Sequence, residues 1–184
     1  MESNPELVLI DKPKGITSFD VIRILRRKLN VKKIGHAGTL DPLATGLMIL
    51  GVGPGTKRLT ELVKLDKEYI TEVLIGESRT TGDMEGEVVE EKKVTEEAEF
   101  LRNKITAVLE SMVGELTLPV SAYSAVKVDG VPMYKRARKA EKTGESVSIV
   151  PMRTMIVYKA ELMGEVHTRG YRAMATVCFH VGSG

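Results

Sequence analysis

A glycine-rich loop that carries a single carboxylate and leads directly into an apolar run is the feature that most constrains this sequence. The loop covers residues 35–46, GHAGTLDPLATG, and the apolar run covers residues 47–52. Glycine lets a backbone approach another group closely, and Pro42 fixes the φ angle directly after Asp41. Loops held by a rigid scaffold often carry catalytic groups. Asp41 is therefore a candidate catalytic carboxylate, although the local pattern suits a turn or a helix cap equally well.

Four motifs follow one another along the chain: LVLIDKPKGITSFDV at residues 7–21, GHAGTLDPLATGLMILGVGPGTK at 35–57, DKEY at 66–69 and SAYSAVKVDG at 121–130. In sequence and in order they resemble the motifs of the TruB family of tRNA pseudouridine synthases. The resemblance implies isomerisation of the T-loop uridine of tRNA to pseudouridine. Ionised Asp41 would be the nucleophile, or would remove a proton from the sugar, once the base has left its stack. The implied reaction needs no cofactor and no metal.

The resemblance also implies five substrate-binding residues, which are Lys12, His36, Tyr69, Tyr123 and Lys127. His36 would lie at the RNA loop and help to hold it open, since an uncharged imidazole can stack on a base. Tyr69 would pack against the target uracil, a contact worth about 1–3 kcal/mol. Lys12, in a basic turn, would contact an RNA phosphate, and Lys127 would meet a phosphate or a carboxylate. Without the resemblance, position alone is compatible with ordinary structural or surface roles for these side chains.

Two departures from the family pattern bear on activity. Residues 79–83 read Arg-Thr-Thr-Gly-Asp where the family has Thr-Asp-Thr-x-Asp, so Thr80 replaces the first aspartate while Asp83 is kept. The sequence ends at Gly184, before the family's Gly-Thr-Tyr-Ile-Arg motif and its C-terminal RNA-binding region. The arginine of that motif pairs with the catalytic aspartate. We therefore interpret residues 1–184 as a partial catalytic domain and expect weak activity or none from this chain alone.

Positive charge is segregated along the chain. Residues 1–33 hold eight Lys or Arg against four acids, and a second cluster comprises Lys135, Arg136, Arg138, Lys139 and Lys142. Between them, residues 83–99 carry eight acids and two lysines. Separated positive patches suit a polyanion such as RNA, although a charge run alone is also compatible with a solvated helix face.

The remaining composition indicates an ordinary globular protein of a reducing cytoplasm. Hydrophobic residues make up 42% and charged residues 28% of the chain, no apolar stretch approaches membrane-spanning length, and the N-terminus lacks a secretory pattern. The single cysteine, Cys178, cannot form an internal disulfide, and His167 and His180 lack ligand-spaced partners. The glycine-rich run at residues 51–57 misses the phosphate-loop spacing, and Arg58 stands where Ser or Thr should follow, which argues against a nucleotide triphosphatase.

The pattern of strands and helices predicts an α+β fold. We expect strands at about residues 7–11, 47–52, 67–75, 88–93, 147–150, 154–162 and 171–181, and helices capped by Thr17 or Ser18, by Thr56 and by Thr95, with a fourth at 133–142. Alternate residues from Tyr171 to Val181 predict one buried strand face. The order favours the pseudouridine synthase catalytic fold, C-terminally incomplete, with a mixed, largely antiparallel sheet and flanking helices. It argues against a doubly wound parallel sheet.

Two other functions stay open on the sequence alone. A non-catalytic RNA-binding module would use the basic patches and Tyr69, and would not need Asp41. A glycoside hydrolase would need a second carboxylate across the cleft, for which Asp83 is the candidate. The sequence leaves the oligomeric state open, and a monomer that binds the T-arm loop of tRNA is the expectation.

Overall fold

The chain divides after Leu65 into two structural units, Met1–Leu65 and Asp66–Gly184. The computed structural model describes residues 5–124, 126–143 and 150–182. The interpretation of residues 1–184 as one partial catalytic domain does not anticipate this division, and it stays a prediction.

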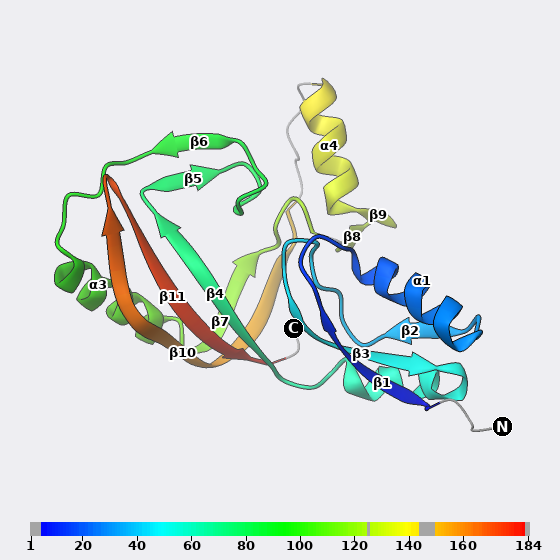
Figure 1. Cartoon of the computed structure of the whole chain (residues 1–184). Coiled ribbons are helices and arrows are strands. Elements are labelled where there is room, and N and C mark those ends of the chain that lie inside the picture. The colour runs from blue at the N-terminus through cyan, green and yellow to red at the C-terminus, as the bar shows by residue number, and fades with distance from the viewer. Residues whose placement is uncertain (1–4, 125, 144–149, 183–184) are drawn as a thin grey trace. The chain divides into compact units, whose positions relative to one another are not determined.

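A small antiparallel sheet and one helix form most of the first unit. Strand β1 (Leu7–Lys12) pairs with β3 (Gly46–Val52), and β2 (Ile34–His36) pairs with the other edge of β3. Helix α1 (Ser18–Leu29) lies along one face of this sheet (Figure 1). A 3₁₀ helix, η1 (Gly53–Arg58), and the short helix α2 (Leu59–Leu62) follow β3. The loop that carries Asp41 therefore connects two neighbouring strands, β2 and β3.

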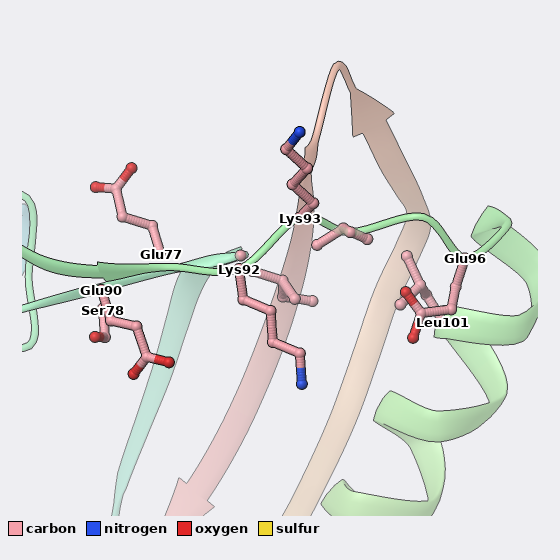
Figure 2. A pocket seen from close by; sticks show the side chains of 10 residues that line it. Glu77, Ser78, Glu90, Lys92, Lys93, Glu96 and Leu101 are labelled. Carbon is pink, nitrogen blue, oxygen red and sulfur yellow. The ribbon is translucent and has the colours of Figure 1, made fainter.

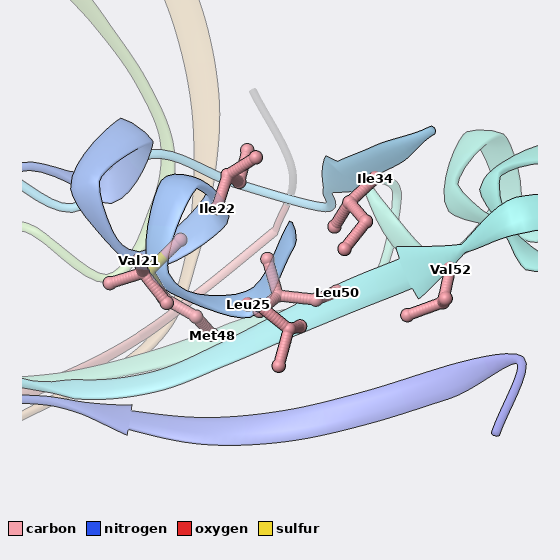
Figure 3. Packing of buried hydrophobic residues seen from close by; sticks show 7 residues of the cluster. All are labelled: Val21, Ile22, Leu25, Ile34, Met48, Leu50 and Val52. Carbon is pink, nitrogen blue, oxygen red and sulfur yellow. The ribbon is translucent and has the colours of Figure 1, made fainter. Parts of the chain in front are cut away.

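The hydrophobic core of the first unit lies between α1 and β3. Figure 3 shows the side chains that fill it, with Val21, Ile22 and Leu25 from α1, Ile34 from β2, and Met48, Leu50 and Val52 from β3. Helical spacing places the first three on one helix face, and alternation places the last three on one strand face. The predicted helix and the predicted strand are both confirmed here. The pairing of β2 with β3 fixes the two ends of the Asp41 loop.

Helix α1 begins with a capping box at Thr17, one of the two residues that the sequence analysis predicted as its cap. The Asp20 N–H donates to Thr17 Oγ1 at 3.1 Å, and the Thr17 N–H donates to Asp20 Oδ2 at 2.9 Å. Hydrogen bonds from Thr17 hold the pKa of the Asp20 carboxyl below its ordinary 3.8. Because folding lowers this pKa, ionised Asp20 adds to the free energy of unfolding at pH values above 3.8. This contribution is lost as the pH falls through the lowered pKa.

The Thr17→Ala substitution is expected to lower the free energy of unfolding by about 1 kcal/mol, since it removes the side-chain acceptor of the helix N-cap. Urea titration at neutral pH, followed by circular dichroism, would measure this loss. The difference from the unsubstituted protein should shrink in acid, because the Asp20 partner is then protonated. A loss that did not change with pH would contradict the assignment of the reciprocal pair.

A four-stranded antiparallel sheet forms the centre of the second unit, in the order β4–β11–β10–β7 (Figure 1). The strands are β4 (Lys67–Ile75), β7 (Gly114–Pro119), β10 (Met152–Arg169) and β11 (Arg172–Val181). Helix α3 (Ala98–Ser111) packs on one face, where Leu101 joins Val166, Ala173 and Ala175. The remaining elements are two small hairpins, β5 (Glu77–Arg79) with β6 (Val88–Glu91) and β8 (Lys127–Val128) with β9 (Val131–Pro132), and helix α4 (Met133–Thr143).

The predicted α+β class is confirmed, and all strand pairs in the described part of the chain are antiparallel. The alternation predicted for the last strand is also confirmed, because Ala173, Ala175 and Val177 are buried on one face of β11. Tyr171 departs from that alternation and is 60% exposed. The reason is that Tyr171 precedes β11, in the turn that follows Gly170 at its positive φ of 63°.

Two predicted helix caps are wrong. Helix α3 begins at Ala98, and Glu97 takes the cap position without a side-chain hydrogen bond, so Thr95 is not the cap. Thr56 lies inside η1, where its hydroxyl donates to the Gly53 carbonyl at 2.8 Å. The strand predicted at residues 147–150 falls largely on 147–149, outside the described residues.

Candidate active site

Asp41 lies in the β2–β3 connection with its side chain exposed to solvent. A turn does form at this point, but the Asp41 backbone makes it, since the Ala44 N–H donates to the Asp41 carbonyl oxygen at 3.1 Å. Within the described residues, the carboxylate itself makes no hydrogen bond or ion pair. The turn interpretation of the sequence therefore accounts for the backbone at Asp41 and leaves the carboxylate available to a ligand.

The residue after Asp41 is held by the turn that follows β1. The Gly15 N–H donates to the Pro42 carbonyl at 2.8 Å. The Lys12 ammonium donates to the carbonyls of Pro13 at 3.0 Å, Ile16 at 2.9 Å and Pro42 at 3.4 Å. An ammonium has three N–H donors, and each has an acceptor here. Lys12 therefore ties the Asp41 loop to the neighbouring turn.

The phosphate contact expected of Lys12 is not supported by this geometry. The Lys12 residue is 0% exposed, so its ammonium does not reach a ligand at the surface. Burying a charged group is favourable only when it is paired or hydrogen-bonded, and the three carbonyls supply those bonds. Lys12 acts here on the position of the loop, and its contact with an RNA phosphate stays a prediction.

The residue before Asp41 is held by α1. Ser18, the first residue of α1 and only 3% exposed, accepts from the Leu40 N–H at 2.9 Å and donates to the Leu40 carbonyl at 2.9 Å. The sequence analysis considered Ser18 only as a possible helix cap and missed this role. Asp41 thus stands between two anchored neighbours, Leu40 and Pro42. A loop fixed on both sides presents its carboxylate in a defined place, as a reacting group requires.

His36 ends β2 and belongs to the same unit as Asp41. Its backbone is paired with Leu50 of β3, and the Ala37 N–H donates to the Ile49 carbonyl at 2.9 Å. The His36 Nδ1 atom is buried and has no hydrogen-bond partner among the described residues. A buried polar atom without a partner is unfavourable by about 1–3 kcal/mol, and this nitrogen is one that the described residues leave unsatisfied.

The other three predicted substrate-binding residues belong to the second unit. Tyr69 lies on β4 opposite Phe179 of β11 and is 45% exposed, which leaves part of its ring for stacking. Tyr123 is partly buried in a turn closed by the Ser124 N–H, which donates to the Ser121 carbonyl at 3.0 Å. Lys127 begins β8 and is exposed. The structure therefore places Asp41, His36 and Lys12 in one unit, and Tyr69, Tyr123 and Lys127 in the other.

Asp83, the second carboxylate that a glycoside hydrolase would need, has a local structural role. Its Oδ1 accepts from the Thr81 hydroxyl at 2.6 Å and from the Glu85 N–H at 3.0 Å. These bonds shape the turn between β5 and β6. In the part of the chain that the structure covers, no three His, Cys, Asp or Glu side chains gather to hold a metal ion. None of the described helices is both long and apolar enough to cross a membrane.

The Lys12→Met protein is expected to lose about 1–3 kcal/mol of unfolding free energy, because three carbonyls lose their donor. Lys14→Met is the matched control, since Lys14 lies in the same turn and is exposed. Urea titration of both variants would measure the two losses. Equal losses would show that the enclosed ammonium of Lys12 does not stabilise the loop.

Solved structures share this combination of α+β units. The chain resembles a chain of the crystal structure of a Cbf5-Nop10-Gar1 complex with a TM-score of 0.57 and 24% identity, over 95% of this chain and 39% of that one. It also resembles a chain of an H/ACA RNP bound to a substrate RNA containing 2′-deoxyuridine, with a TM-score of 0.54 and 21% identity, over 97% of this chain and 44% of that one. At these identities the likeness establishes the fold.

Sequence relatives establish the family. Residues 26–182 match the family described as TruB family pseudouridylate synthase (N terminal domain). A tRNA pseudouridine synthase B of Leifsonia xyli subsp. xyli is 41% identical over 159 residues, or 86% of this chain and 51% of that protein. Another, of Opitutus terrae, is 47% identical over 133 residues, or 72% and 54% of the two chains. The chain belongs to the TruB family of pseudouridylate synthases, and it spans about half the length of the curated relatives it matches.

Proposed function

We propose that this protein isomerises uridine to pseudouridine in tRNA, at the uridine of the T loop. The observation that carries the proposal is the anchored Asp41 loop, in which Leu40 is bound to Ser18 and Pro42 to Lys12 and Gly15. Membership of the TruB family and relatives named tRNA pseudouridine synthase B support it. The proposal includes action as a monomer in the cytoplasm.

The carboxylate of Asp41 starts the reaction in this proposal. It attacks the ribosyl carbon that bears the base, or removes a proton from the sugar, and the bond to the uracil nitrogen breaks. The detached uracil turns within the site and rejoins the sugar through its C5 carbon. The C5 hydrogen leaves to solvent as a proton and a nitrogen gains one, so substrate and product have the same composition. The step needs neither an oxidant nor a second substrate.

The remaining predicted residues have supporting roles in this proposal. The flat imidazole of His36, which is partly exposed, suits contact with a base of the opened RNA loop. The exposed part of the Tyr69 ring suits stacking on the target uracil. Tyr123 and Lys127 contact the substrate from the segment that leads into β8. Lys12 positions the Asp41 loop.

Tritium release from a tRNA transcript labelled at uridine C5 tests the proposal on the full-length protein. Release that matches the amount of pseudouridine mapped in the T loop would support it. Free uracil in the supernatant would favour the hydrolase, because only hydrolysis liberates the base. Tight tRNA binding without release of tritium or uracil would sink both enzymatic functions and leave an RNA-binding module.

A further inference from the structure

A charged hollow lies in the second unit, where the β10–β11 hairpin meets the chain on either side of the β5–β6 hairpin. Its volume is about 510 Å³, and it is lined by Gly76, Glu91, Lys92, Lys93, Arg169, Tyr171 and Arg172. Four of these seven residues are cations and one is an acid. None of them belongs to the proposed uridine site.

Backbone hydrogen bonds join the three segments that form this hollow. The Lys92 N–H donates to the Gly76 carbonyl at 2.9 Å, and the Val94 N–H donates to the Tyr171 carbonyl at 2.9 Å. Arg169 and Arg172 are register partners at the end of the β10–β11 ladder. A Cβ on Gly76 would lie 2.9 Å from the Lys92 carbonyl oxygen and 3.1 Å from that of Tyr171, at a φ of +103°. The close approach of these segments therefore depends on a glycine at position 76.

This arrangement concentrates positive charge that the sequence spreads out. The two lysines of the otherwise acidic stretch of residues 83–99 are Lys92 and Lys93, and the fold places both beside the arginines of the hairpin. Figure 2 shows an adjoining hollow, which shares Gly76, Lys92 and Lys93 with this one and is also lined by Glu90 and Glu96. The two lysines leave the chain there in opposite directions. Lys93 lies on the Tyr171 side, its ammonium 4.5 Å from the centre of the Tyr171 ring.

The single acid of the hollow is already paired. Arg172 contacts Glu91 at 2.6 Å and the fully buried side chain of Glu77 at 2.6 Å, so this arginine and Glu91 neutralise each other locally. Lys92, Lys93 and Arg169 make no ion pair with any residue that the structure describes. Three cations that share one hollow repel each other, and an anion bound between them would relieve that repulsion.

We propose that this hollow binds a backbone phosphate of the RNA substrate, with Lys93 and Arg169 as the phosphate-facing cations and the exposed Tyr171 ring beside them. The proposal rests on the proposed function, since it requires an RNA substrate. Lysine and arginine donate to phosphate oxygens, and an aromatic ring next to them suits a nucleotide. Glu90 and Glu96 line the adjoining hollow and not this one, whose lining has four cations and one acid. Such a contact adds affinity without reading the sequence of the RNA.

The Arg169→Glu substitution tests this site, with Arg153→Glu as the matched control. Both arginines are exposed and lie on β10, and both substitutions change the charge equally, but Arg153 does not line the hollow. We expect Arg169→Glu to weaken binding of an unmodified tRNA transcript several-fold and to lower the slope of log Kd against log salt by about one. Lys93→Gln should act in the same direction, and turnover at saturating tRNA should not change.

Three outcomes would overturn the proposal. Equal weakening by Arg169→Glu and Arg153→Glu would mean that only net charge matters. Binding of inorganic phosphate is measured from the NMR chemical shifts of the residues that line the hollow. If Arg169→Glu abolished this binding but left the affinity for tRNA unchanged, the site would be one for free phosphate. Unchanged binding of both would leave no anion site. Absence of pseudouridine formation by the unsubstituted protein would instead be a failure of the proposed function, and it is measured separately.

Discussion

The Asp41→Asn protein is expected to bind tRNA as tightly as the unsubstituted protein and to form no measurable pseudouridine. Asparagine keeps the size and shape of the side chain, but it lacks the charge that both a nucleophile and a base require. Removing such a group lowers turnover on the order of 10⁴-fold. Because the Asp41 carboxylate is exposed and unpaired within the described part of the chain, its loss should leave the fold intact. Tritium release and filter binding, made side by side, measure the two effects.

Asp129→Asn is the control for that experiment. Asp129 adopts a positive φ of 50°, which asparagine also tolerates, and its side chain is 80% exposed beside Arg136. Turnover should therefore be retained. Asp83→Asn distinguishes the glycoside hydrolase from the synthase. Only the hydrolase needs Asp83 as a second reacting carboxylate, so only the hydrolase should lose activity. An Asp41→Asn protein that still released tritium would remove Asp41 from the mechanism.

Periodic segments of this fold could be predicted from the sequence because their packing follows the residue pattern. Val21, Ile22 and Leu25 recur at helical spacing, and Ala173, Ala175 and Val177 alternate, so each set has one buried face. Strand β2 is only three residues long and carries no such pattern. The caps at Thr56 and Thr95 were predicted wrongly because a lone threonine fits many turns, and only the neighbouring backbone decides which bond it makes.

The candidate site also has a part that the sequence predicts and a part that it does not. The carboxylate at Asp41 could be predicted, because residue type and motif both mark it. Its supports could not, because they join side chains to backbone carbonyls far along the chain. Lys12 reaches Pro42 across 30 residues and Ser18 reaches Leu40 across 22. Every residue has a backbone carbonyl, so the residue type does not mark which carbonyl will accept a bond. A lysine in a basic turn is nearly always exposed, and the sequence therefore favoured a phosphate contact for Lys12.

Glycines of the run at residues 51–57, which superficially suggests a phosphate loop, have a packing role in the structure. A Cβ on Gly55 would lie 1.9 Å from the Glu6 carbonyl oxygen and 2.7 Å from its carbon. That oxygen also accepts from the Val52 N–H at 2.8 Å, so the chain before β1 cannot retreat without losing this bond. A Cβ on Gly51 would likewise lie 2.8 Å from the Gly55 carbonyl oxygen. Glycine is required here because two backbones touch.

The Gly55→Ala substitution is therefore expected to destabilise the protein by about 3 kcal/mol, at the upper end of what overpacking usually costs. Gly38→Ala is the matched control, because no atom lies within 4 Å of a Cβ built there and the position has no positive φ. The control should change the unfolding free energy by no more than about 0.5 kcal/mol. Urea titration of both variants measures the difference. Equal losses would mean that the close contact at Gly55 relaxes without strain, and that some other constraint selects glycine between β3 and α2.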